Sequence, residues 1–302
     1  MQPTATIESV QRRGGLVGVT TGLAVLALAL LAVQVARGSA TDGRTHRAGT
    51  AVVTVYEQPQ PRGVMVTTGG WAYCEQVRAL ARNTGYTLLC GRYAKDGYTG
   101  PGLRSARQLD WGDRAYLSSL AAEARALHGR VGGELVLLGV SYSGYGVAAL
   151  ASHHPELKPD RLVVIDSYLD LSARRAAAGP KGTGLEIDRE TGGSAAALAA
   201  RNVRVKGLAQ LVAGGTRISV VWSVSPEEAR EFNGATCNRA ANAAVLQRLA
   251  NDLGRPVTAW VTRSQHGHNL WNHGRPIMRG EMPGRKVTFR PGESPPADAS
   301  CS

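Results

Sequence analysis

One serine in this chain has the neighbours that a catalytic nucleophile needs. Residues 139–144 (GVSYSG) lie between the apolar run ELVLLGV and a stretch rich in alanine and glycine that is typical of a helix. A serine on a tight strand-to-helix turn requires small residues two positions before and after it, because the backbone there is strained. Gly139 and Ser143 meet this need around Ser141. Ser143 is the rival candidate, but Tyr145 would then occupy a position that should be small.

A serine hydroxyl is a poor nucleophile at neutral pH, so the chemistry also needs a general base. The stretch 265–271 (QHGHNLW) follows the last apolar run and supplies two histidines. His268 is the predicted base and His266 is its competitor. Two histidines this close could instead bind a metal ion, but no convincing third ligand stands nearby in the sequence.

Two carboxylates could orient the base. Asp166 ends the predicted strand RLVVID, and Glu227 follows the predicted strand RISVVWSV. The stretch 225–228 (SPEE) also has the pattern of a helix start with a capping box, which would account for both of its glutamates without catalysis. We therefore place Asp166 first and keep Glu227 as the alternative acid.

These residues, in the order serine, acid, histidine, resemble the α/β-hydrolase family, whose elbow motif is G-x-S-x-G. Ser143 replaces the usual last glycine of that motif. The stretch 67–71 (TTGGW) is similar to the family's His-Gly-x oxyanion loop without its histidine, and Gly267-His268 is similar to its terminal Gly-His loop. The resemblance covers residues 50–275 and implies that the backbone N–H groups of Trp71 and Tyr142 form the oxyanion hole.

The resemblance implies a serine hydrolase that cleaves carboxylic esters, with a small-molecule or lipid-like substrate and no cofactor or metal. A peptidase or acyltransferase on the same scaffold is an alternative, because acyl chemistries share this site. A non-catalytic surface protein of the same fold is the second alternative.

Apolar runs alternate with helical patterns along residues 50–283, which predicts one α/β domain with a mostly parallel sheet flanked by helices on both sides. The runs at 51–56 and 63–67 are expected to form a hairpin after a linker at residues 38–49. Residues 171–215 break the rhythm and are expected to form a lid. Residues 284–302 are rich in Pro, Ser and Gly and are expected to form a flexible tail.

The N-terminal segment indicates export. Residues 16–36 carry no charge and follow Arg12-Arg13, as in a signal peptide or an uncleaved membrane anchor. Residues 1–40 are therefore assigned to targeting, and the protein is expected outside the cytoplasm, either secreted or anchored to the membrane. Cleavage could follow Gly38 or Ala40.

Four cysteines fit an oxidising location. Cys74 opens a predicted helix and Cys90 ends the next strand, so these two are expected to form a disulfide. Cys237 and Cys301 would pair by elimination. The formal net charge of +12 favours anionic surroundings, but the arginines are scattered rather than clustered with aromatic residues, so no nucleic-acid partner is expected.

Overall fold

The computed structural model describes residues 43–93, 110–181, 183–223, 238–264 and 268–296. All of them belong to the larger of two compact units in the chain, residues 43–302. The predicted targeting segment lies outside the described residues. Within the described ranges no helix is long and apolar enough to cross a membrane.

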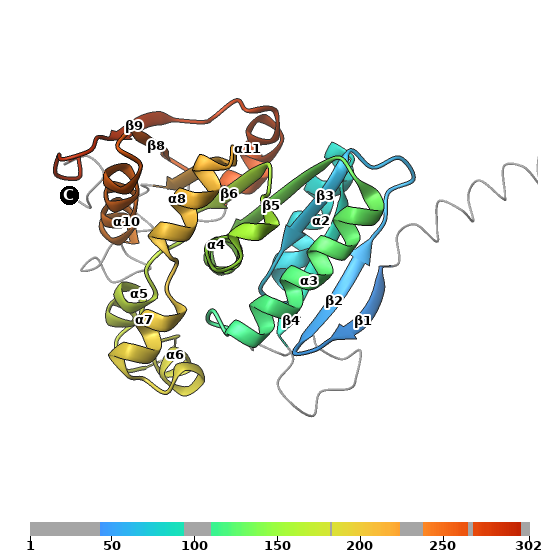
Figure 1. The fold of residues 1–302 in the computed structure, drawn as a ribbon, viewed down its shortest axis with the longest axis horizontal. Coiled ribbons are helices and arrows are strands. Elements are labelled where there is room, and N and C mark those ends of the chain that lie inside the picture. Colours follow the sequence, from blue (N-terminus) through green and yellow to red (C-terminus); the bar gives the residue numbers. More distant parts are fainter. Residues whose placement is uncertain (1–42, 94–109, 182, 224–237, 265–267, 297–302) are drawn as a thin grey trace, which may run out of the picture. The chain divides into compact units, whose positions relative to one another are not determined.

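The described residues form a mixed sheet with helices on both faces (Figure 1). The strands are β1 (Arg44–Ala48), β2 (Ala51–Tyr56), β3 (Gly63–Thr67), β4 (Thr87–Tyr93), β5 (Glu134–Val140), β6 (Arg161–Ile165), β7 (Arg217–Ser223), β8 (Val257–Thr262) and β9 (Arg285–Phe289). The helices are α2 (Gly70–Thr84), α3 (Arg114–Val131), α4 (Tyr142–His153), α5 (Leu171–Ala178), α6 (Thr183–Thr191), α7 (Ala195–Arg201), α8 (Val205–Ala213), α10 (Asn238–Leu253) and α11 (His268–Arg279), with a 3-10 turn, η2, at Pro155–Leu157.

The sheet order is β1-β2-β4-β3-β5-β6-β7-β8-β9. From β4 to β8 every neighbouring pair is parallel, whereas β1, β2 and β9 join antiparallel at the edges. The central strands are continuous apolar runs because both of their faces are covered. The predicted α/β architecture, a mostly parallel sheet flanked by helices, is confirmed.

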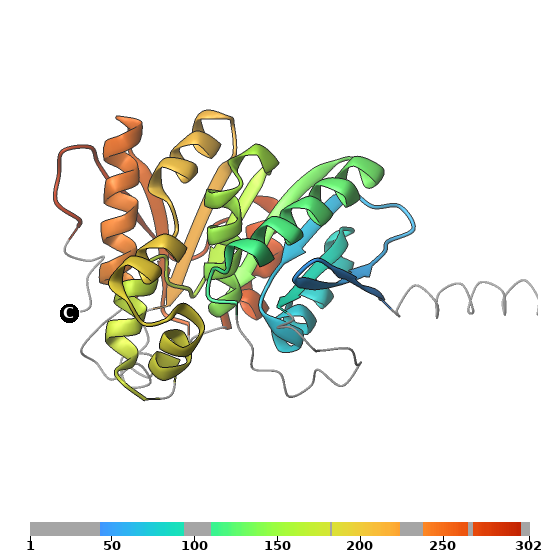
Figure 2. The same cartoon turned by 60° about the horizontal axis from the view of Figure 1, so that its bottom comes forward.

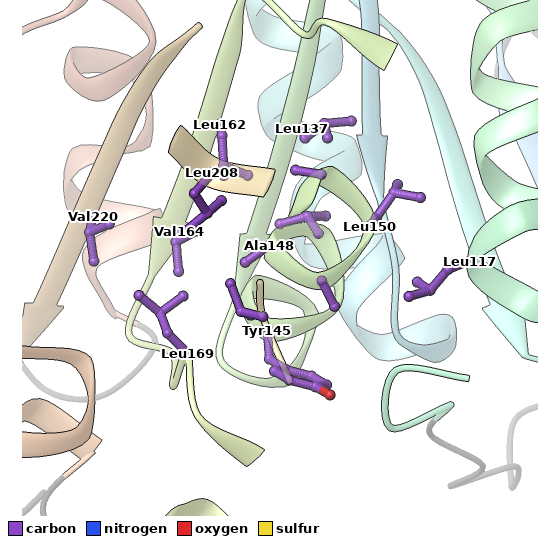
Figure 3. Close-up of a cluster of buried hydrophobic side chains, with 14 of the residues drawn as sticks. Leu117, Leu137, Tyr145, Ala148, Leu150, Leu162, Val164, Leu169, Leu208 and Val220 are labelled. Atoms are coloured by element: carbon purple, nitrogen blue, oxygen red, sulfur yellow. The ribbon is translucent and has the colours of Figure 1, made fainter. Parts of the chain in front are cut away.

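Successive side chains of one strand enter different cores. Leu135 and Leu137 of β5 pack in the larger cluster with residues of α3, α4, α8 and α10. Val136 and Leu138 point the other way, into a second cluster with residues of α2 and α11. Figure 3 shows part of the larger cluster, where side chains of α4 and α8 meet those of the central strands. Both helical layers are thus fixed to the strands that carry the candidate site.

The predicted hairpin between residues 51–56 and 63–67 is wrong. β4 lies between the two strands, antiparallel to β2 and parallel to β3. All five residues of β3 are buried, and β4 and β5 pair with its two edges. A central strand of this kind needs a partner on each edge, and the chain supplies both through crossovers rather than a local turn.

Both ends of the predicted domain extend further than expected. Residues 44–48, expected as linker, form β1, which pairs with β2. Residues 285–289, expected as tail, form β9, which pairs with β8. In β9 the alternate side chains Val287 and Phe289 are buried in the larger core, which holds this short strand in place although the residues after it are rich in Pro, Gly and Ser.

The predicted lid divides into two parts. Helices α5, α6 and α7 gather together, below α4 in Figure 1 and toward the viewer in Figure 2. Helix α8 instead packs on α4 and α10 as part of the main layer. A Cβ on Gly207 of α8 would lie 1.9 Å from the carbonyl oxygen of Ser152 in α4, so only glycine permits this approach. Helix α8 is therefore part of the main helical layer, and we refer to α5–α7 as the cap segment.

The predicted bridge between Cys74 and Cys90 is present, with their Cα atoms 5.7 Å apart. It ties α2 to β4, next to the turn that begins α2. Cys237 and Cys301 lie outside the described residues.

Candidate active site

Four polar residues lie where four neighbouring parallel strands end. Ser141 follows β5 and Asp166 follows β6, while Ser223 and Thr262 are the last residues of β7 and β8. The carboxyl ends of parallel strands meet at one edge of a sheet, which is the usual position of a site in an α/β protein. In the sequence the first and the last of them, Ser141 and Thr262, are more than a hundred positions apart.

Ser141 has the strained backbone expected of a nucleophile on a tight turn. Its φ is 54° and its ψ is −124°, at the position just before α4. Its N–H donates to the carbonyl oxygen of Ile165 at 2.9 Å, which joins the turn to the end of β6. A Cβ on Gly139 would lie 2.2 Å from the carbonyl oxygen of Ser143, so the turn can form only with glycine there.

The side chain of Ser143 forms hydrogen bonds within the turn. Its hydroxyl donates to the carbonyl oxygen of Val140 at 2.9 Å and accepts from the N–H of the same residue at 2.8 Å. The side chain is fully buried. The serine at this position of the motif therefore closes the elbow with two hydrogen bonds, and this geometry favours Ser141 over Ser143 as the reactive hydroxyl.

The two segments predicted to form the oxyanion hole lie against each other. Gly69, at φ 93°, precedes α2, and a Cβ on it would lie 2.8 Å from the Tyr142 ring. The hydroxyl of Thr68 donates to the carbonyl oxygen of Ser143 at 3.4 Å. These contacts bring the first turn of α2, which includes the backbone of Trp71, beside the first turn of α4, which begins at Tyr142. Both are helix N-termini, where N–H groups favour negative charge.

Asp166 is buried and has a positive φ of 47°. Three hydrogen bonds converge on its Oδ1. The N–H and the hydroxyl of Ser223 donate at 2.9 Å and 2.7 Å, and the side-chain amide of Asn269 donates at 2.9 Å. The carboxylate is thus held in one orientation at the end of β6.

Asn269 links this carboxylate to the start of α11. Its side chain is fully buried, and its Oδ1 accepts from the hydroxyl of Thr262 at 2.9 Å. Its Nδ2 also lies 3.1 Å from Ser223 Oγ. Asn269 follows His268, the first residue of α11, so the network fixes the backbone at His268 near Asp166. The side chain of His268 lies outside the described residues, as do His266 and Glu227.

Sequence reasoning did not identify Ser223 and Asn269. Ser223 ends a predicted strand, and Asn269 follows the predicted base. These two positions were the only signals that the sequence offered. Within the described residues, no group of three or more His, Cys, Asp and Glu side chains is arranged to hold a metal ion.

The side chain of Tyr142 is clamped beneath the elbow. Its hydroxyl donates to the carboxylate of Asp110 and accepts from the N–H of Trp111 at 2.9 Å. The second oxygen of Asp110 accepts from the N–H of Gly112 at 2.9 Å. Burial raises the pKa of Asp110 to about 6. Sequence reasoning missed Asp110 because it stands in a loop without a recognisable motif.

Aromatic side chains surround the hydrogen-bonded pair of Tyr142 and Asp110. Trp111 meets Tyr142 edge to face with ring centroids 4.9 Å apart, and Tyr145 stacks on Tyr168 at 5.2 Å. The hydroxyl of Tyr145 donates to the carbonyl oxygen of Arg201, at the end of α7, at 2.9 Å. The aromatic cluster therefore connects the elbow to the cap.

No protein-family model matches this chain, and no curated protein matches its sequence. Solved structures do match its fold. A capsule O-acetyltransferase of Neisseria meningitidis serogroup A aligns with 78% of this chain and 92% of its own, at 12% identity and a TM-score of 0.52. A highly thermostable carboxyl esterase from Bacillus coagulans aligns with 79% of this chain and 96% of its own, at 14% identity and a TM-score of 0.50.

An acylaminoacyl peptidase is also similar, over 79% of this chain and 40% of that longer chain, at 15% identity and a TM-score of 0.51. At such identities the likeness concerns the fold alone, and function depends on the site. Together with the sheet order and its flanking helices, these matches identify the architecture. The chain has the α/β-hydrolase fold.

Proposed function

We propose that this chain is a serine hydrolase that cleaves carboxylic esters through an acyl-enzyme on Ser141. One observation carries the proposal. Ser141 and Asp166 both stand at positive φ, at the ends of adjacent parallel strands, and Asp166 accepts a hydrogen bond from the residue that follows His268. This is the chain order and the strand-end position in which the α/β-hydrolase fold assembles a nucleophile, an acid and a base.

In the proposed reaction His268 takes the proton of Ser141 as its Oγ bonds to the ester carbonyl carbon. The carbonyl oxygen becomes negative and is bound by the backbone N–H groups of Trp71 and Tyr142. The intermediate collapses, the bond to the leaving alkoxide breaks, and His268 returns the proton to it. Water, deprotonated by the same histidine, then releases the carboxylic acid. Asp166 orients the imidazole and stabilises its positive form.

We further propose that the enzyme works outside the cytoplasm on a small-molecule or lipid-like ester. The uncharged stretch at residues 16–36 supports export. The Cys74–Cys90 bridge supports an oxidising compartment, because disulfides persist there and are rare in the cytosol. The net charge of +12 favours substrates at anionic surfaces.

The test is reaction of the full-length chain with a fluorophosphonate, followed by intact mass. Wild type, Ser141→Ala, Ser143→Ala and His268→Ala are compared. Labelling is expected in wild type and Ser143→Ala and is expected to be lost in the other two. Ser143→Ala is the matched control, because it removes a hydroxyl of the same elbow two residues after Ser141. Folded wild type that takes no label would refute the assignment and favour a non-catalytic role.

A second assay separates the acyl chemistries that this fold supports. Unlabelled wild type should hydrolyse p-nitrophenyl acetate and butyrate, with free acid as the product. Transfer of the acyl group to an added alcohol in preference to water would indicate an acyltransferase. Cleavage of blocked peptide amides without ester cleavage would indicate a peptidase.

A further inference from the structure

The ring of Tyr142 supports both segments that are proposed to bind the oxyanion. Tyr142 is the first residue of α4, and its own N–H is one of the two proposed donors. A Cβ on Gly69, just before α2, would lie 2.8 Å from this ring, so the backbone that leads into Trp71 packs directly against it. The ring is buried. Its position therefore sets how far the first turn of α2 lies from the first turn of α4.

Two groups of one loop hold the far end of this ring. The hydroxyl of Tyr142 donates to the carboxylate of Asp110 and accepts from the N–H of Trp111 at 2.9 Å. The indole of Trp111 meets the ring edge to face, with centroids 4.9 Å apart. Asp110 is only 1% exposed. The ring cannot shift without breaking a buried hydrogen bond, which is unfavourable because the separated groups would be left unsatisfied.

The loop that carries Asp110 is itself fixed. The carbonyl oxygen of Asp110 accepts from the N–H of Asp113 at 2.9 Å and from Nη1 of Arg201 at 3.0 Å. Its second carboxylate oxygen accepts from the N–H of Gly112 at 2.9 Å. Asp113 in turn caps α3, where its side chain accepts from the N–H of Tyr116 at 2.9 Å. These bonds join Asp110 to α3 and to the end of α7, so its carboxylate is a fixed support for the ring.

The same loop contains backbone strain and a buried charge. Trp111 has a φ of 44°, a conformation that bulky residues rarely adopt and that it shares with Ser141 and Asp166. Burial raises the pKa of Asp110 to about 6, so its carboxyl is ionised inside the protein at neutral pH, which lowers the stability of the fold. Strain and perturbed buried charges are concentrated at functional sites. Their position beneath the elbow favours a role in the reaction.

We propose that Asp110 is a positioning residue of the oxyanion hole, which acts through the hydroxyl of Tyr142 to hold the N–H groups of Trp71 and Tyr142 at the separation that an oxyanion requires. The proposal rests on the proposed function. Asp110 does not touch the ester and takes no part in proton transfer. It keeps its hydrogen bond to Tyr142 throughout the reaction. Donors that are in place before the reaction begins stabilise the new charge without reorganisation.

A purely structural bond between Tyr142 and Asp110 predicts a different result. Its removal would lower the stability of the protein and leave the kcat of the folded enzyme unchanged. If the bond positions the donors, its removal should lower kcat by about 10- to 100-fold, because small misplacements of catalytic groups have effects of this size. KM should change little, since the donors bind the oxyanion more strongly than the carbonyl of the bound ester.

The experiment compares full-length wild type, Tyr142→Phe, Asp110→Asn, the double variant and Tyr86→Phe. The kcat and KM for p-nitrophenyl acetate are measured at a temperature where thermal unfolding shows every variant to be folded. The inhibition constant of a trifluoromethyl ketone, whose adduct carries an oxyanion, is measured for each. Phenylalanine at position 142 keeps the ring that packs on Gly69. Tyr86→Phe is the matched control, because it removes a phenol that donates to the carboxylate of Glu134, at the opposite end of β5 from Ser141.

We expect Tyr142→Phe and Asp110→Asn each to lose kcat and trifluoromethyl ketone affinity, while Tyr86→Phe keeps both. The double variant should lose no more than the weaker of the two single variants, because both substitutions remove the same contact.

Wild-type kcat and ketone affinity in either folded single variant, with fluorophosphonate labelling intact, would overturn the role of Asp110 and leave the proposed hydrolase standing. Losses that multiply in the double variant would also overturn it, because Asp110 would then not act through Tyr142. An equal loss in Tyr86→Phe would indicate general destabilisation and overturn it as well. Absence of labelling in wild type would remove the proposed function and this inference with it.

Discussion

Replacing Asp166 with asparagine should separate the structural role of its carboxylate from the catalytic one. All three of the donors described around it, the N–H and hydroxyl of Ser223 and the amide of Asn269, converge on Oδ1. An asparagine can keep these bonds with its own Oδ1. The opposite amide orientation would turn Nδ2 toward the N–H of Ser223, donor against donor, so the network itself selects the first orientation.

With that orientation, the amide nitrogen replaces Oδ2, the oxygen we assign to the imidazole of His268. A donor would then face the imidazole N–H and favour the wrong tautomer. In a serine protease, replacing the aspartate that holds the imidazole by asparagine lowers kcat by about 10⁴-fold. We therefore expect kcat of Asp166→Asn to fall by about two to four orders of magnitude, with a loss of unfolding free energy of only about 1 kcal/mol.

Asp166→Ala supplies the contrast. It removes the acceptor from three buried donors, each costing about 1–3 kcal/mol when left unsatisfied, so stability should fall by several kcal/mol along with activity. Asp160→Asn is the matched control. Its carboxylate accepts from the N–H of Leu135 at 2.7 Å, at the opposite end of β6, and its substitution should leave kcat unchanged.

The assays are steady-state hydrolysis of p-nitrophenyl acetate and urea unfolding followed by tryptophan fluorescence. Near-wild-type kcat in a folded Asp166→Asn would refute the reasoning and move the acid to Glu227. Glu227→Gln should then produce the loss instead.

Three further outcomes are expected. Ser143→Ala should lower the unfolding free energy by about 1–2 kcal/mol in urea titrations, because its hydroxyl makes two buried bonds in the elbow, while the label on Ser141 stays. The free energy of unfolding of wild type should fall as pH rises from about 4 to 6. The pKa of Asp110 is raised from 3.8 to about 6, so the folded protein binds this proton more tightly than the unfolded chain, a difference of roughly 3 kcal/mol. Asp110→Asn should lack this fall, and parallel pH profiles for the two proteins would contradict the assignment. Cys74→Ser should lower the unfolding free energy by about 3 kcal/mol, since the bridge spans 16 residues. Dithiothreitol should lower the stability of wild type by more than that of Cys74→Ser, and equal sensitivity of both proteins would count against the bridge.

The sequence was sufficient to predict those features of the structure that depend on residues close together along the chain. The elbow around Ser141 is such a case, because Gly139 leaves room for the tight turn and Ser143 closes it with hydrogen bonds, both within two positions of Ser141. The apolar runs likewise predicted central strands covered on both faces. Cys74 and Cys90 were paired correctly because a helix and the strand after it pack side by side.

The order of strands could not be predicted from local patterns. A hairpin between β2 and β3 and the insertion of β4 between them are equally compatible with two apolar runs around a turn. The choice depends on burial of both edges of β3, which is a property of the assembled sheet. The short strands β1 and β9 were missed for the same reason, since each is held by its pairing partner.

The candidate site depends most on tertiary structure. The bond between Asp166 and Asn269 joins residues 103 positions apart, and the bond between Asp110 and Tyr142 joins residues 32 apart. No local pattern encodes such pairs, because they meet only after parallel strands place their carboxyl ends along one edge of the sheet. The sequence therefore determined which residue types could do acyl chemistry and in which order they occur. The tertiary structure decided that Asp166 is buried and bonded to Asn269 in the first turn of α11, and that Tyr142 is bonded to Asp110, since distance and burial exist only in the folded chain.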